Sequence, residues 1–335
     1  MSPSTPRRVA VTGLGALSPG GEGVAACRSW LQRVRRAGGA RDARILGFEP
    51  GEYIRNPKRL RSMHRTFQLV AAAAVVAMRA AGLPSAERLA DAGVLPERAG
   101  IAAALADLSP LTPDLLQVLA QTPLDGSALN WAQFAELSLH QLHPFRRLTL
   151  LANMAAAHTS LLFGLQGPSF TFTTGAAAGA QTIAEAYWTI AHDRADLMLC
   201  QTAESPEQAF TAHPGVEVAG AVVLESWDQA RRRGAAVLAE LTAGDAAARF
   251  TGATPGAGAQ GPAPSEAQRW LGAEGPQAGA SISGTRALGA QGPAPSEASP
   301  AAGLMAALLR LDAAAGGPVE LGTLLAPPER LEVPA

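Results

Sequence analysis

Apolar runs and helical periodicity alternate along the first 225 residues of the chain. Short β-branched or apolar runs bounded by glycine or polar residues predict strands, whereas longer alanine- and leucine-rich stretches predict helices. Strands are expected at residues 8–14, 99–105, 169–174, 196–201 and 220–225. Helices are expected at residues 65–81, 148–163 and 180–192. Strands that alternate with helices in this way are typical of a layered α/β domain.

The remaining segments have a different character. Residues 111–142 are amphipathic and helical, with Trp131 and Phe134 as candidate anchors. From residue 244 to 302 small and polar residues dominate, and the decapeptide GAQGPAPSEA begins at Gly258 and again at Gly289. Such a composition buries little apolar surface and predicts a tether, with a repeated surface turn as the alternative. A helix at 301–311 and an extended tail at 319–325 are expected to pack back onto the core. The expected domains are 1–243, the linker 244–302 and a C-terminal remnant 303–335.

Composition narrows the functional classes. The 335 residues carry a formal net charge of −1, which argues against nucleic-acid binding because such proteins need a basic face. Two distant cysteines, Cys27 and Cys200, favour a reducing cytoplasm. The apolar run near the N-terminus is too short and glycine-rich for a signal peptide, and no stretch predicts a membrane span. His140 and His143 lack a third ligand at metal-site spacing, so no metal is expected.

Five segments, in order, resemble the β-ketoacyl synthase family of the thiolase fold. They are VAVTGLGALSPGG, RLRSMHRTFQLVAAAAVVAMRAAGL, HPFRRLTLLANMAAAHTSLLFGLQGPSFTF, ADLMLCQTAE and EVAGAVVLE. Together they span residues 8–225. The resemblance implies a thiolase-like layered αβαβα fold whose second half is shortened or degenerate here.

The resemblance also shows which chemistry is missing. The family attacks its thioester with a cysteine at the elbow between a strand and a helix, and that cysteine aligns with Ala176, whose methyl group is not a nucleophile. The family's two histidines come from its second half, in an H-G-T-G-T loop and a lysine–histidine segment. Here every histidine precedes residue 214, and Arg286 stands where the lysine is expected. No catalytic residue and no cofactor is therefore expected.

An inactive member of this family has a known precedent, the chain-length factor. The resemblance implies a heterodimer with a catalytic ketosynthase, in type II polyketide, aryl-polyene or fatty-acid-like biosynthesis served by an acyl carrier protein that this chain contacts indirectly. By resemblance, residues 169–174 pair with their mate across the two-fold axis. The pocket and interface candidates are Trp131, Phe134, Phe170, Phe172, Thr174, Gly175 and Ala176. For the two residues of the 111–142 segment, an ordinary core role is an equal alternative.

Two further functions stay open. A malonyl-carrier-protein decarboxylase would use a glutamine at the elbow together with the histidines, and Gln181 lies five positions beyond Ala176. A homodimeric scaffold protein would need no partner. Among the other polar residues, His158 is expected to be a core or interface histidine, Glu204 a structural acceptor and Cys200 a buried small hydrophobe.

Overall fold

A computed structural model describes nine stretches of the chain. They are residues 6–37, 43–83, 89–105, 113–142, 151–173, 177–205, 216–242, 300–314 and 317–320. The expected linker 244–302 lies almost wholly outside them, so its role stays a prediction.

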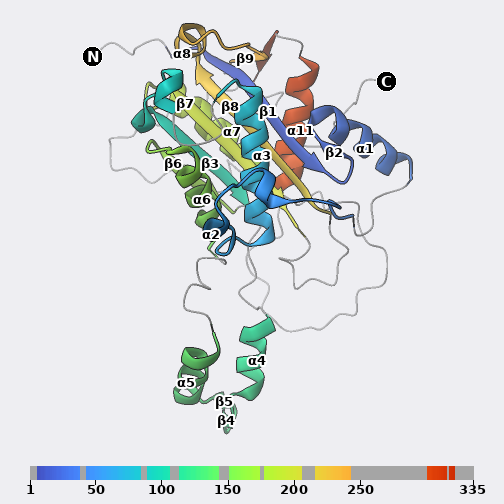
Figure 1. Cartoon of the computed structure of the whole chain (residues 1–335), viewed down its shortest axis with the longest axis vertical. Coiled ribbons are helices and arrows are strands. Elements are labelled where there is room, and N and C mark those ends of the chain that lie inside the picture. Colours follow the sequence, from blue (N-terminus) through green and yellow to red (C-terminus); the bar gives the residue numbers. More distant parts are fainter. Residues whose placement is uncertain are drawn as a thin grey trace, which may run out of the picture.

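One mixed sheet forms the centre of the molecule (Figure 1). Its strands follow the order β10-β9-β1-β8-β7-β3-β6, and the short β2 pairs with β1. β3, β6 and β7 run parallel to one another, whereas β8 is antiparallel to both β1 and β7. The strand bounds are β1 Val9–Ser18, β2 Gly21–Glu22, β3 Ala99–Leu105, β6 Ser169–Phe172, β7 Leu197–Glu204, β8 Val218–Ser226, β9 Ala239–Thr242 and β10 Pro318–Glu320.

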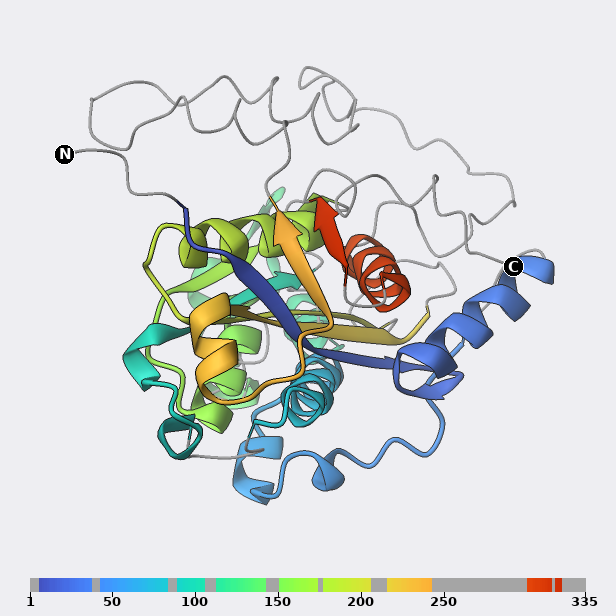
Figure 2. The same cartoon turned by 90° about the horizontal axis from the view of Figure 1, so that it is seen from above.

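Helices cover both faces of this sheet (Figure 2). One face carries α3 (Arg65–Ala80) and α6 (Asn153–Phe163), and the other carries α7 (Ala177–Ala191) and α11 (Pro300–Ala313). Each pair of helices closes its own apolar core against the sheet. α11 places Leu304, Leu308 and Leu311 in the second core, all nearly inaccessible to solvent.

Shorter elements surround this framework. They are α1 Val24–Arg36, η1 Pro50–Glu52, α2 Pro57–Leu60, η2 Leu89–Ala92, η3 Pro96–Arg98 and α8 Trp227–Arg232. A separate lobe, residues 113–142, extends away from the body and is called the arm below (Figure 1). It consists of α4 (Pro113–Gln121), the hairpin β4 (Leu124–Asp125) and β5 (Ala128–Leu129), and α5 (Trp131–Gln141).

The layered α/β architecture predicted from the sequence is confirmed. The helix expected at 301–311 packs onto the core as α11, and the described start of the tail expected at 319–325 pairs with β9 as part of β10. α1 and β9 were not predicted. Within the described stretches a single large sheet lies between two helical layers, and the second sheet of a five-layer fold is not among these residues. None of the described helices has the length and hydropathy that a membrane crossing requires.

Two glycines in β1 allow α3 to pack unusually close to the sheet. A Cβ added at Gly15 would lie 2.2 Å from the carbonyl oxygen of Ala73, and one at Gly13 would lie 2.3 Å from that of Ala77. Both partners are backbone atoms of a helix, so they cannot rotate away as a flexible side chain would. The alanines of α3 and the glycines of β1 therefore form one matched surface.

Gly15→Ala tests this close approach. We expect it to lower the free energy of unfolding by about 3 kcal/mol, because the added methyl group forces the helix away from the sheet. Urea unfolding followed by circular dichroism measures the change. Gly51→Ala is the matched control, since a Cβ there meets nothing within 4 Å. Equal stability of the two variants would contradict the interpretation.

Candidate functional site

The carboxyl ends of the parallel strands β3, β6 and β7 lie side by side, along the edge of the sheet at which strands end. Because these strands are parallel, the loops that follow them converge there. Helix α7 begins at the same edge, at Ala177. The predicted elbow residues Thr174, Gly175 and Ala176 lie between β6 and α7 but outside the described residues. The sequence order of strand, elbow and helix is thus retained, while the elbow's own geometry stays a prediction.

β6 is the outermost strand on this side of the sheet. It pairs with β3, and its other edge has no strand neighbour among the described elements. Phe170 and Phe172 lie opposite Ala102 and Ala104 of β3, so both face the side that carries α7. Both are partly buried, and Phe170 packs against the core beneath α7. The two phenylalanines thus lie on the strand that precedes the elbow, and their role in a pocket or interface stays a prediction.

The two thiols of the chain are both inert by environment. Cys200 is fully buried in β7, where its Sγ lies 3.4 Å from the carbonyl oxygen of Thr182, and burial strongly raises its pKa. Cys27 is equally buried in α1, and desolvation raises its pKa to about 11. A thiol with so high a pKa supplies almost no thiolate at neutral pH. Cys200 is the buried small hydrophobe expected.

The described histidines come from four different elements. His64 precedes α3, His140 lies on α5, His158 lies on α6, and His192 directly follows α7, where its ring stacks on Trp188. His158 is 8% exposed and packs against Phe67, with ring centroids 6.0 Å apart. Burial is the main cause of its lowered pKa, so the ring is neutral at pH 7. It is the core histidine that the sequence predicted. No group of three potential metal ligands occurs among the described side chains.

A buried ion pair that the sequence did not reveal lies beside the same edge. Glu217, at the start of β8, is fully buried and accepts two hydrogen bonds from Arg65, at 3.1 and 3.0 Å. It also accepts from the backbone N–H of Ile45 at 2.8 Å and from the hydroxyl of Ser205 at 3.2 Å. Desolvation opposes ionisation, but these hydrogen bonds outweigh it and hold the pKa of Glu217 below its usual value. The network joins the first turn of α3 to the end of β7.

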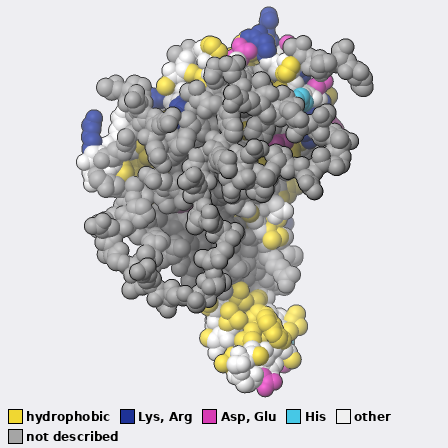
Figure 3. Space-filling model, turned by 180° about the vertical axis from the view of Figure 1, so that it is seen from behind, with side chains coloured by type: hydrophobic (Ala, Val, Ile, Leu, Met, Phe, Trp, Pro, Cys, Tyr) yellow, Lys and Arg dark blue, Asp and Glu magenta, His cyan; other side chains and the backbone are white. Residues whose placement is uncertain are grey.

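The other two candidates, Trp131 and Phe134, lie in the arm. Their rings pack edge to face with centroids 5.8 Å apart. Trp131 is 69% exposed, so it is not a core aromatic within this chain. Figure 3 shows hydrophobic side chains gathered on the arm, where Leu124 and Leu139 are also largely exposed. The structure therefore separates these two residues from Phe170 and Phe172, which lie in the sheet.

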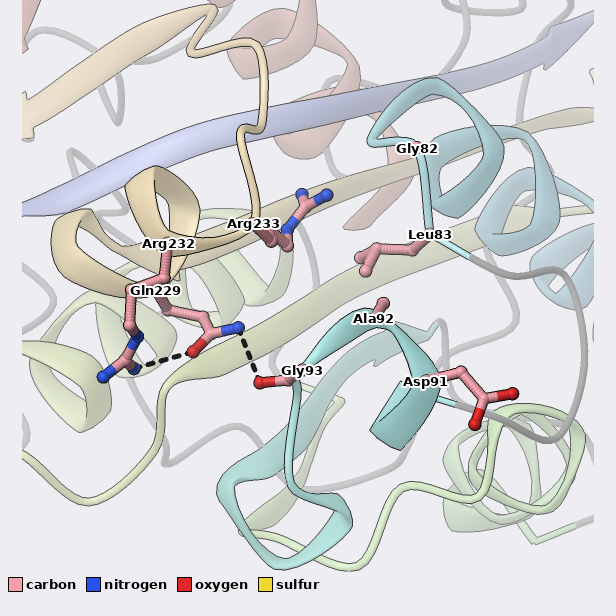
Figure 4. Close-up of a pocket in the computed structure, with 8 residues that line it drawn as sticks. All are labelled: Gly82, Leu83, Asp91, Ala92, Gly93, Gln229, Arg232 and Arg233. Carbon is pink, nitrogen blue, oxygen red and sulfur yellow. Dashed lines mark hydrogen bonds between the residues drawn. The ribbon is translucent and has the colours of Figure 1, made fainter.

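An open pocket of about 800 Å³ lies at the opposite end of the molecule, between α8 and the end of α3. Figure 4 shows Gln229 hydrogen-bonded to Arg232 and to Gly93 in this pocket. Arg233 binds Glu225 at 2.5 and 2.7 Å, while Gln229 donates to the Gly93 carbonyl and accepts from Arg232. The pocket is lined by Gly82, Leu83, Asp91, Ala92, Gly93, Gln229, Arg232 and Arg233. We assign it no catalytic role.

A family model, the N-terminal domain of β-ketoacyl synthases, matches residues 6–221, which is more than half of the chain. The chain belongs to the β-ketoacyl synthase family. Among curated proteins, the mitochondrial 3-oxoacyl-[acyl-carrier-protein] synthase of Arabidopsis thaliana is 32% identical over 136 residues, or 32% of this chain and 30% of that protein. The putative polyketide β-ketoacyl synthase 1 of Streptomyces halstedii is 28% identical over 220 residues, or 61% of this chain and 48% of that protein.

Solved structures agree with this assignment. A ketosynthase structure, in which a type II polyketide synthase acyl carrier protein is in complex with its ketosynthase bound to the hexaketide, matches with a TM-score of 0.56 and 26% identity. The match covers 70% of this chain and 67% of that one. The ishigamide ketosynthase/chain length factor matches with a TM-score of 0.51 and 24% identity over 70% and 62% of the two chains. The fold is thus the thiolase-like α/β fold of ketosynthases. This ketosynthase relative spans only part of its curated homologues, 30% of one and 48% of another.

Glu217→Gln tests the buried ion pair. We expect the variant to lose about 3 kcal/mol of stability at pH 7, because Arg65 is left without its carboxylate. Since the folded-state pKa of Glu217 lies below its usual 4.5, the pair stabilises the protein fully above that pH and loses its effect as the pH falls below it. The difference between wild type and variant should therefore shrink below about pH 4.5 in urea titrations. Glu136→Gln, on the exposed surface of α5, should change little; a constant difference at all pH values would contradict the assignment.

Proposed function

We propose that this chain is a catalytically inactive ketosynthase-like subunit that pairs with an active ketosynthase and shapes its acyl pocket. The observation that carries the proposal is the loss of the nucleophile in a chain that keeps the family's fold. Alanine stands at position 176, and both cysteines of the chain are buried with raised pKa values. Condensation needs a group that attacks a thioester and then leaves, and none of these side chains does so.

The edge of β6 that no described strand pairs with supports a paired subunit. An exposed strand edge presents unpaired backbone N–H and C=O groups, which favour the addition of a strand from another chain. Ser169 at the start of β6 is exposed, and the rest of the strand is half-buried. If the partner is an active ketosynthase, a strand paired here would bring its elbow next to Phe170 and Phe172. An inert copy would then supply the wall of the pocket while its mate supplies the chemistry.

The arm supports the same arrangement. Leu124, Trp131 and Leu139 are 68%, 69% and 83% exposed, which is an unusual concentration of large apolar side chains on a lobe of 30 residues. Exposed apolar groups that gather on one surface mark a contact with another protein. Within the chain the arm is held mainly by its own α4–α5 packing, with Gln141 donating to Gln121 at 2.7 Å. In this proposal, the apolar side of the arm contacts the partner and closes part of its acyl pocket.

Co-expression with the ketosynthase encoded beside this chain tests the pairing. We expect a one-to-one complex in size-exclusion chromatography with mass determination, and chain extension by the complex but not by this chain alone. Ala176→Cys in this chain should leave turnover unchanged, because the family's two histidines are also missing here. A self-associated protein that ignores the ketosynthase would favour a homodimeric scaffold, and condensation by this chain alone would refute the proposal.

Trp131→Ala tests the role of the arm in the same complex. We expect a shift toward longer acyl products, measured by mass spectrometry, because removing the indole deepens the pocket that it closes. The fold should tolerate the change, since the side chain is 69% exposed in this chain. Phe134→Ala should act in the same direction. Gln133→Ala, on the exposed side of the same helix, is the control, and an unchanged product distribution in all three variants would refute this role.

A further inference from the structure

The pocket between α8 and the end of α3 has the dimensions of a small-molecule site. Its volume of about 800 Å³ lies within the range of ~300 to 1,000 Å³ that is typical of such sites. Three elements line it, namely the end of α3, the turn η2 and the helix α8. The 16 residues of α3 separate it from the strand ends beside the elbow by roughly 24 Å, since a helix rises about 1.5 Å per residue. The pocket is therefore distinct from the acyl pocket of the proposed function.

Two glycines keep the wall of this pocket open. Gly82 follows α3 and Gly93 follows η2, with φ angles of +69° and +74° that favour glycine. A Cβ at Gly93 would meet nothing within 4 Å, and one at Gly82 would lie 3.9 Å from Nη1 of Arg233. Both turns thus border free space and leave their backbone accessible to a ligand.

Arg232 carries the charge in this pocket that is available to a ligand. Its neighbour Arg233 binds both carboxylate oxygens of Glu225 and the carbonyl oxygen of Ala81, so the charge of Arg233 is compensated within the protein. Arg232 is exposed and makes no ion pair with any side chain in the described part of the chain. A lone guanidinium in a pocket attracts an anion.

The guanidinium of Arg232 is also held in place. Its Nη2 donates to Oε1 of Gln229 at 2.7 Å, and Nε2 of Gln229 donates to the carbonyl oxygen of Gly93 at 2.9 Å (Figure 4). Gln229 is only 3% exposed, so its amide is fixed by its surroundings. Arg232 makes no other hydrogen bond with the described residues, and its remaining N–H groups can donate to a ligand. Such preorganisation lowers the entropy that binding costs.

The other walls of the pocket restrict the class of ligand. Figure 4 shows Asp91 well apart from Arg232, with Leu83 and Ala92 between them in this view. Leu83 and Ala92 supply apolar surface for a hydrocarbon group. The carboxylate of Asp91 repels negative charge, which disfavours a dianion such as a phosphate monoester. The walls therefore favour a monoanion with an apolar body.

We infer that this pocket binds a small monocarboxylate, whose carboxylate group pairs with Arg232 and whose apolar part lies against Leu83 and Ala92. The inference goes beyond the proposed function, because the site lies away from the elbow and requires neither a partner subunit nor a catalytic group. It gives the chain a ligand site of its own, separate from the pocket that it is proposed to shape.

Titration of 4-fluorobenzoate into the purified full chain, followed by fluorine NMR, tests the inference. We expect saturable binding that weakens about 10-fold in Arg232→Gln, because the charged hydrogen bonds to the carboxylate are lost. Arg232→Lys should recover only part of the affinity, since an ammonium group lacks the planar fork that pairs with both carboxylate oxygens. Arg231→Gln is the matched control, because it removes an equal charge from the adjacent exposed arginine, which does not line the pocket.

A second variant tests the apolar wall. Ala92→Leu narrows the pocket and should also weaken the binding of 4-fluorobenzoate, while circular dichroism checks that each variant keeps the wild-type fold.

Several results would overturn the inference. The wild-type chain could fail to bind either 4-fluorobenzoate or hexanoate saturably, or Arg232→Gln could bind as well as wild type. An equal loss in Arg231→Gln would indicate a diffuse charge effect instead of a site. Equal affinity for 4-fluorobenzyl alcohol would exclude carboxylate recognition, and tighter binding of phenyl phosphate would contradict the class of ligand. None of these outcomes bears on the pairing with a ketosynthase, which the mass of that complex tests separately.

Discussion

The close packing of α3 against β1 is the constraint on which the rest of the structure depends. Gly13 and Gly15 remove the side chains that would otherwise hold the helix away, and the carbonyl groups of α3 fill that space. Because α3 is fixed in this way, its first turn brings Arg65 to the buried carboxylate of Glu217. That ion pair in turn joins the start of β8 to the end of β7, beside the edge where the elbow begins. Close backbone packing and a buried ion pair thus together fix the position of α3 and the strand ends beside the elbow.

The contacts that hold this fold are made by residues that need no chemical reactivity. The sheet is held by β1, β8 and β7 and by helices that bury alanine, valine and leucine, and none of these contacts requires a reactive group. The proposed function is compatible with this framework, because none of these contacts depends on a cysteine at the elbow. The buried Cys200 shows the opposite case, a thiol kept for its size and apolar character.

The parts that the sequence predicted were those with a local pattern. The strand that became β3 and the helix that became α3 are rich in apolar residues, and both lie within a residue of their predicted bounds. α1 was missed because its apolar positions are interrupted by four arginines, which resemble a solvated loop. The pair of Arg65 and Glu217 was missed for another reason: 152 residues separate the partners, and only the fold brings them together. Of the candidate site, β6 forms within the strand predicted at 169–174, whereas Trp131 is exposed on an arm whose position local periodicity could not predict.

The C-terminal helix α11 fills a recess in the sheet that would otherwise expose apolar side chains. A Cβ at Gly220 of β8 would lie 2.6 Å from Leu308 and 2.8 Å from Met305, so the sheet has a recess into which α11 fits. The helix buries Leu304, Leu308 and Leu311 there, and β10 then adds to the sheet beside β9. Without these elements the face that carries α7 would expose an apolar surface that water disfavours. Packing therefore requires a helix and a strand after residue 299, while nothing in it requires histidines. The sequence has this pattern, since α11 and β10 are present and every histidine precedes residue 214.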